Sequence, residues 1–152
     1  METKEIAAFN IIGTSIRTTN EKGQSSTDIA GLWKKFLSEN ISDQIPHKLE
    51  HTIYCVYTDY EKDYTKPYTI LLGCKVKSLD IIPDNLVGRS FSGGKYVIFT
   101  PKGKMKTDIV FLEWLKIWTT EIDRAYTADF EVYGMKAQDP DNAEIDIHIS
   151  IR

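Results

Sequence analysis

The chain has few cysteines and no long apolar run, and both absences exclude whole classes of protein. Only Cys55 and Cys74 occur in 152 residues, whereas small secreted domains without a large core depend on several disulfides. Both fall in expected strands, where we expect small buried apolar side chains, although neighbouring strands would still permit a bond. Apolar runs stay far below the roughly 18 residues of a membrane helix, and "METKEIAAFNIIG" lacks a secretory pattern. We therefore expect a cytoplasmic protein without membrane association.

An excess of positive charge is also absent, which argues against a nucleic-acid partner. The formal net charge is −3, and the densest basic stretch is "KGKMK" at 102–106. Proteins that bind nucleic acid directly obtain most of their affinity from a basic face. We expect no direct contact with nucleic acid, and a mildly acidic surface instead attracts cationic small molecules.

Metal, cofactor and catalytic patterns are missing as well. His47 and His51 have the spacing of helical metal ligands, but Pro46 and the strand-like "TIYCVY" leave no room for that helix. The segment "GRSFSGGKY" lacks the Ser or Thr of a phosphate loop and precedes a strand rather than a helix. We expect surface histidines, a tight glycine turn, no metal and no cofactor, and no spacing identifies a catalytic triad or dyad.

The periodicities present in the sequence predict one structural unit that occurs twice. Helices have an apolar stripe at spacings of three and four residues, and strands alternate with period two. Ser25, Ser26 and Thr27 are expected caps of the first helix, and Thr107 of the second. The expected elements are a strand at 5–17, a helix at 26–39, strands at 52–60 and 67–77, a strand in "GGKYVIFTPKG", a helix at 107–119, and strands in "ADFEVYG" and "AEIDIHISIR".

The resulting β-α-β-β order, once in about 1–79 and again in 80–152, predicts an α+β fold with pseudo-twofold symmetry. The bridge is "LVGRSFSGG". We expect an antiparallel sheet with two helices on one face and a ligand groove between them. In the last strand Ile145, Ile147 and Ile149 are expected in the core, with His148 and Ser150 on a solvated face.

The order and spacing of these segments resemble the gyrase-inhibitor-like small-molecule-binding family. The similarity rests on "FNIIGTSIRTT", "GLWKKF", "YCVYTDYEKDY", "YTILLGCKV", "GGKYVIFTPKG", "WLKIW", "ADFEVYG" and "IDIHISI". That family includes the effector-binding domain of some bacterial transcription regulators. The resemblance implies a duplicated βαββ fold and a central cavity with aromatic walls. It also implies a key carboxylate in the penultimate strand, matched here by Glu131. The DNA-binding helix-turn-helix segment of those regulators has no match, so the chain resembles stand-alone members in one domain, 1–152.

The candidate site therefore combines Glu131 with aromatic rings. Organic cations favour the faces of Trp and Tyr, where attraction is worth roughly 0.5 to 2 kcal/mol. The expected ligand-binding residues are Glu131, Tyr133, Trp33, Phe36, Tyr54, Tyr57, Tyr68, Trp114 and Trp118. Two plainer interpretations remain open: rings at helical spacing are ordinary core, and Glu131, which shares a strand face with Asp129 and Tyr133, faces solvent.

The sequence favours a non-enzymatic protein that binds amphipathic, cationic aromatic compounds, with two alternatives. One is contact with a protein partner, DNA gyrase or a regulator, through the loop "DYEKDYTKPY". The other is hydrolysis of cyclopropane-bearing genotoxins, which some relatives are implied to perform, with Glu131 as the acid and Tyr133 as a donor. Acid–base chemistry commonly needs a second positioned group, and Asp129 and Asp146 are expected to face solvent.

Overall fold

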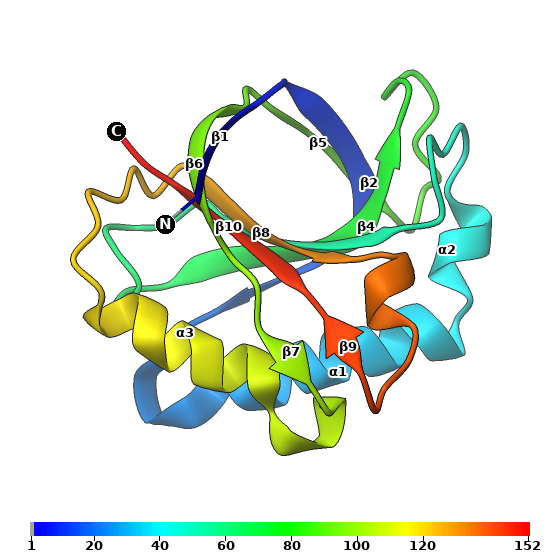
Figure 1. Cartoon of the computed structure of the whole chain (residues 1–152). Helices are drawn as coiled ribbons and strands as arrows, with labels where there is room; N and C mark the ends of the chain where they lie inside the picture. Colours follow the sequence, from blue (N-terminus) through cyan, green and yellow to red (C-terminus); the bar gives the residue numbers. More distant parts are fainter. Residues whose placement is uncertain (1) are drawn as a thin grey trace.

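An eight-stranded antiparallel sheet organises residues 2–152, the part of the chain that the computed structural model describes (Figure 1). Neighbouring strands are hydrogen-bonded antiparallel throughout. The order across the sheet is β1 (Glu2–Ile6), β6 (Gly94–Phe99), β10 (Asp146–Ser150), β8 (Ala128–Tyr133), β3 (Ile53–Thr58), β4 (Tyr68–Val76), β2 (Phe9–Thr18) and β5 (Val87–Phe91).

The strand order confirms the predicted duplication. Strands β3, β4 and β2 run outward from the centre on one side, and β8, β10 and β6 do so on the other. The pseudo-twofold axis therefore falls between β3 and β8. The first strand of each half pairs with a strand of the other half: β1 pairs with β6, and β5 pairs with β2.

Three expected strand boundaries are wrong. The strand expected at 5–17 is two strands, because β1 lies at one edge of the sheet and β2 lies next to the strand at the other edge. The expected bridge contains β5, and the glycine turn lies after it, at Gly93 and Gly94 with φ of 75° and 130°. The last strand is interrupted: β9 (Ala143–Glu144) pairs with β7 (Lys102–Gly103) before β10 begins.

Both long helices, α1 (Gln24–Ser38) and α3 (Ile109–Thr119), cover the same face of the sheet (Figure 1). The predicted side-chain caps are wrong. Gly23, with φ of 71°, precedes α1, and Asp108, with φ of 54°, precedes α3, so left-handed residues begin both helices without a cap bond from a side chain. The short helix α2 (Ile41–Gln44) and the 3₁₀ turns Glu21–Gly23, Met105–Thr107 and Met135–Ala137 complete the elements.

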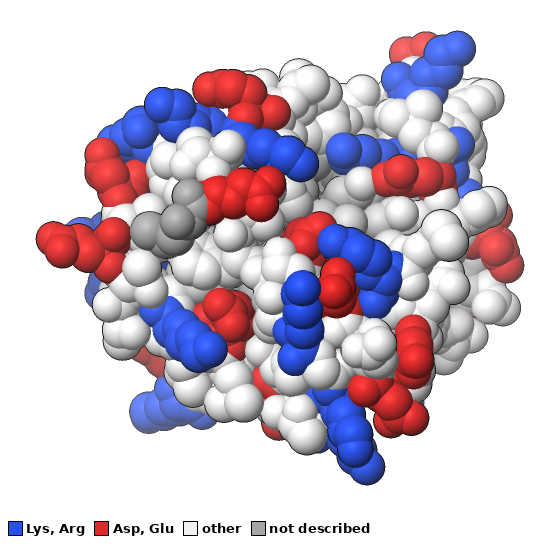
Figure 2. All heavy atoms as spheres, viewed as in Figure 1, with Lys and Arg blue, Asp and Glu red and all other residues white. Residues whose placement is uncertain are grey.

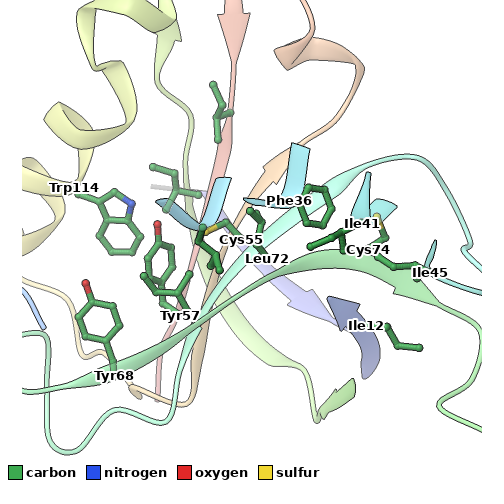
Figure 3. Packing of buried hydrophobic residues seen from close by; sticks show 14 of the residues in the cluster. Ile12, Phe36, Ile41, Ile45, Cys55, Tyr57, Tyr68, Leu72, Cys74 and Trp114 are labelled. Atoms are coloured by element: carbon green, nitrogen blue, oxygen red, sulfur yellow. The ribbon is translucent and has the colours of Figure 1, made fainter. Parts of the chain in front are cut away.

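Two apolar clusters lie on opposite faces of the sheet. The larger packs under the helices and contains Phe36, Cys55, Leu72 and Trp114 (Figure 3). The smaller lies on the other face, where the sheet curls over itself (Figure 1), and includes Phe9, Tyr54 and Phe130.

The second cluster explains why one prediction for the last strand is wrong in part, namely that His148 and Ser150 face solvent. His148 is 8% exposed and Ser150 is 3% exposed. The ring of His148 stacks on Phe130, with 4.3 Å between centroids. Alternation along a strand distinguishes two faces, but here the curl of the sheet buries the second one too.

His47, His51 and the two cysteines lie in the surroundings that the sequence predicts. His47 and His51 are exposed and lie outside helices. Within residues 2–152 Cys55 and Cys74 are free and buried, on adjacent strands, and Cys55 pairs across with Leu72. No helix in that range combines the length and apolarity needed to traverse a bilayer. Acidic and basic side chains are interspersed on the face shown in Figure 2.

Candidate ligand-binding site

Glu131 is not a solvent-facing strand residue: its side chain is buried and accepts hydrogen bonds from three aromatic side chains. The residue is 2% exposed. Its Oε2 accepts from the Tyr57 hydroxyl at 2.7 Å and from Trp114 Nε1 at 2.6 Å. Its Oε1 accepts from the Tyr133 hydroxyl at 2.6 Å. Strands β3 and β8 supply the tyrosines and α3 supplies the tryptophan, so the carboxylate joins the sheet to a helix.

The protonation states of this group follow from burial. Loss of hydration raises the pKa of Glu131, while its hydrogen bonds from Tyr133, Trp114 and Tyr57 act in the opposite direction. Burial also raises the pKa of both tyrosine hydroxyls well above their ordinary value. The hydroxyls therefore stay protonated and donate, and the carboxyl group is an unusually desolvated acceptor.

Glu131 lines a cavity between the two long helices and the sheet. This space, the larger hollow, has a volume of about 510 Å³, which is within the range of small-molecule sites. Trp33 and Ile29 on α1 form one wall, and Ile109 and Phe111 on α3 form another. Glu131 lies at the floor with Tyr57 and Tyr133.

A second space, the smaller hollow, adjoins the first one. Its volume is about 70 Å³, and Tyr57 and Trp114 line both spaces. Its further walls are Asn20, Tyr60, Tyr64, Tyr68, Phe111, Trp118 and Arg124, with Ser25, Ser26 and Ile29 of α1. The two hollows are therefore adjacent, with the rings of Tyr57 and Trp114 at their common boundary.

The rings around the cavity contact one another edge to face or by stacking. Trp33 and Tyr133 meet edge to face with centroids 4.8 Å apart, and Tyr57 meets Trp114 at 5.2 Å. Tyr64 stacks on Trp118 at 5.3 Å with an angle of 7° between the planes. Such contacts fix flat aromatic surfaces that can accept a flat ligand.

Seven of the nine residues predicted for the site line the larger hollow, the smaller hollow or both. They are Glu131, Tyr133, Trp33, Tyr57, Tyr68, Trp114 and Trp118. Phe36 does not: it is 1% exposed and packs in the core beside Ile41, away from Trp114 (Figure 3). Tyr54 lies on the opposite face of β3, in the second cluster, where its hydroxyl donates to Glu50. Both are therefore excluded from the site.

The sequence did not identify the polar group at the far end of the smaller hollow. Asp129, expected to face solvent, is fully buried. Its Oδ2 accepts from Arg124 Nη2 at 2.7 Å and from the Tyr60 hydroxyl at 2.6 Å. Its Oδ1 accepts from the backbone N–H of Ser150 at 2.8 Å and from the Ser150 hydroxyl at 3.1 Å. Arg124 lies in an irregular segment, where no periodic pattern marks it.

Tyr60 and Tyr64 were also missed, because they belong to the loop expected to reach outward to a protein partner. Both line the smaller hollow, and Tyr64 is held there by Trp118 at the end of α3. Within residues 2–152 no group of three or more His, Cys, Asp or Glu side chains is arranged to hold a metal ion.

Comparison with known proteins identifies the family. Residues 2–151 match the model of the Cass2 family, described as integron-associated effector-binding protein. YobU of Bacillus subtilis (strain 168), named as a candidate transcriptional regulator, is 27% identical over 144 residues, which are 92% of this chain and 90% of YobU.

Solved structures show the same fold. The integron cassette protein VCH_CASS2 from the mobile metagenome of Vibrio cholerae is 30% identical, with a TM-score of 0.76 over 99% of this chain and 95% of that one. SAV2435, solved with bound tetraphenylphosphonium, is 15% identical, with a TM-score of 0.73 over 99% of this chain and 93% of its own. The predicted fold class and the predicted resemblance are both confirmed.

Proposed function

This chain belongs to the family of integron-associated effector-binding proteins, and we propose that it binds aromatic organic cations between α1, α3 and the sheet. The observation that carries the proposal is the carboxylate of Glu131, buried at the floor of an aromatic cavity. We also propose that residues 2–152 act as one binding domain, and that it works in the cytoplasm, where the free thiols of Cys55 and Cys74 stay reduced.

The cavity suits a cation for two physical reasons. Ring faces attract positive charge through their quadrupole, and the attraction grows when water is excluded. A cation near Glu131 also restores part of the favourable solvation that the carboxylate lost on burial, so binding should lower its raised pKa. Ring faces impose little directional demand, so a family of flat or bulky cations fits better than one particular ligand.

A pair of ions with the same shape and opposite charge tests the proposal. Tetraphenylphosphonium, the ion bound to SAV2435, and tetraphenylborate have nearly the same size and aromatic surface. All three tryptophans of the chain line the larger or the smaller hollow, so intrinsic fluorescence reports binding directly. We expect the phosphonium to bind and the borate to bind at least tenfold more weakly. Equal binding, or binding of neither the phosphonium nor any other organic cation, would refute the proposal.

The two alternative functions, contact with a protein partner and hydrolysis, fit this site less well. The loop proposed to contact a protein partner instead places Tyr60 and Tyr64 in the cavity wall, which favours a role in ligand binding. Hydrolysis would require Glu131 to deliver a proton, whereas its three aromatic neighbours are arranged to donate hydrogen bonds to it. We therefore favour binding without turnover. Mass spectrometry of a cyclopropyl-indole compound incubated with the protein should show no ring-opened product above buffer.

A further inference from the structure

Arg124 is buried in the wall of the smaller hollow with part of its hydrogen-bonding capacity unused. Its side chain is 6% exposed, and Nη2 donates to Asp129 at 2.7 Å. Nε and Nη1 are buried and have no hydrogen-bond partner among residues 2–152. A buried donor without an acceptor destabilises the folded state, so such atoms are rare in folded proteins.

Nearby protein groups within residues 2–152 leave these donors without an acceptor. The carboxylate of Asp129 accepts two bonds at each oxygen. The side-chain oxygen of Asn20 accepts from the Tyr68 hydroxyl at 2.6 Å. The ring of Tyr126, 4.3 Å from the guanidinium carbon, attracts its charge but does not replace an oxygen acceptor.

We propose that the smaller hollow is a subsite for a ligand oxygen, a carboxylate or a carbonyl, that accepts a hydrogen bond from Arg124. This inference rests on the proposed function and narrows it. The preferred ligand carries a cationic aromatic part for the larger hollow and an acceptor oxygen for the smaller one. The two spaces are adjacent, because Tyr57 and Trp114 line both, and the proposed ligand extends from one to the other past these rings.

Glu131 and the pair of Arg124 and Asp129 explain why the preferred ligand is not a simple cation. It has a cationic part at one end and an acceptor oxygen at the other. At one end, no positively charged side chain among residues 2–152 pairs with the carboxyl group of Glu131, since its three hydrogen-bond donors are neutral. At the other end Arg124 and Asp129 form an ion pair, which leaves donors but little net charge. An oxygen acceptor therefore meets no net repulsion there, and a contact in this water-poor space is stronger than the same contact in water.

Access to the subsite requires a side chain to move, because neighbouring groups cover both donor atoms in this structure. Tyr64 is the natural candidate, since it lies in the loop between β3 and β4, is half-buried, and is held by its stack on Trp118. Ligand entry that separates this pair should change the emission of Trp118.

Three dyes with the same cationic xanthene core test the subsite. Rhodamine 110 carries a carboxylate on its pendant phenyl ring, rhodamine 123 carries the methyl ester, and a rosamine analogue carries a methyl group instead. We expect one or both rhodamines to bind about tenfold more tightly than the rosamine. A gain for both shows that a neutral carbonyl suffices, and a gain for rhodamine 110 alone identifies a carboxylate subsite.

The matched variants are Arg124→Lys, which keeps a positive charge beside Asp129, and Arg89→Lys, whose parent arginine is half-exposed and paired with Asp59. Arg124→Lys should remove the preference for the rhodamines and leave the rosamine within about threefold of its wild-type affinity. Arg89→Lys should leave all three dyes unchanged.

Equal binding of the three dyes by the wild-type protein overturns the inference without any variant. A folded Arg124→Lys protein that loses all three dyes equally also overturns it, since the arginine would then be structural. Binding of tetraphenylphosphonium with no dye preference would refute only this inference. Failure of all cations to bind would refute the proposed function itself.

Discussion

Replacement of Glu131 by glutamine should strengthen the fold while it weakens ligand binding. Glutamine has the same shape and keeps one acceptor, which can serve Trp114 and Tyr57 where Oε2 now lies. Its amide nitrogen then faces Tyr133, whose hydroxyl can rotate and accept. The hydrogen-bond pattern is thus retained, and the charge that burial disfavours is removed.

The size and the pH dependence of the effect follow from linkage. Burial raises the pKa of Glu131 from its ordinary value of 4.5, so the folded state holds the proton more tightly than the unfolded state. The wild-type free energy of unfolding therefore falls as pH rises from about 4.5 through the raised pKa. The fall is about 1.4 kcal/mol for every pH unit that separates the folded-state pKa from the unfolded-state pKa. We expect Glu131→Gln to be more stable by about 1 kcal/mol at pH 7.5, since neutral hydrogen bonds recover most of the contact energy.

Urea denaturation of both proteins across pH 4 to 8 measures this difference directly. Glu121→Gln, the same change at an exposed carboxylate, is the control and should alter stability by less than about 0.5 kcal/mol. Tetraphenylphosphonium affinity should fall about 10- to 100-fold in Glu131→Gln, because the cation loses its Coulomb attraction to a buried carboxylate. That fall corresponds to about 1.4 to 2.7 kcal/mol. A variant destabilised by more than about 2 kcal/mol at every pH would show that Glu131 is kept for the fold.

Three further predictions concern stability. Asp129→Asn should lower the free energy of unfolding by about 3 kcal/mol in urea titrations, because it breaks a fully buried ion pair. Burial lowers the pKa of His148 from 6.5 to about 4, so the unfolded chain binds the proton first, and stability should decline by about 3 kcal/mol as pH falls from 6.5 to 4. His148→Gln should remove that decline. Gly13→Ala should cost about 3 kcal/mol or more in thermal melts, since its Cβ would lie 2.1 Å from a backbone oxygen. Its control, Gly31→Ala, has open space on an exposed helix face and should instead gain about 0.5 to 1 kcal/mol.

Each of these has a distinct contrary result. A loss below about 1 kcal/mol for Asp129→Asn would mean that the buried guanidinium of Arg124 does not depend on the charge of Asp129. An unchanged pH profile in His148→Gln would assign the acid sensitivity to another group. A stable Gly13→Ala protein would show that β2 and β4 can separate locally without breaking the sheet.

The sequence predicted the fold well because the fold depends on periodicities that local sequence reveals. Alternating isoleucines identified the buried face of β10, and apolar stripes identified α1 and α3. Alternation could not show that His148 is buried, because that depends on how far the whole sheet curls. The curl arises from contacts between strands that are distant in the sequence.

The site was predictable to the extent that it lies on regular elements. The two-residue period puts Tyr54 and Tyr57 on opposite faces, since three positions separate them. The sequence contained that distinction, but it could not show which face the helices cover. Arg124 and Tyr64 lie in loops, whose paths no period determines, so the polar end of the smaller hollow became visible only in the structure.

Duplication alone would make the centre of the sheet symmetric, and the residues at the axis show how the sequence departs from that symmetry. Glu131 on β8 lies directly across from Cys55 on β3, at the pair of strands that flanks the pseudo-twofold axis. A second carboxylate at that position would repel the first and force one of them to bind a proton. The buried thiol instead has its pKa raised by burial and by Glu131 and so stays neutral. The two halves thus place one carboxyl group, that of Glu131, opposite a neutral thiol at the axis. Under the proposed function, this asymmetry is what would let the cavity select a cation over an anion of the same shape.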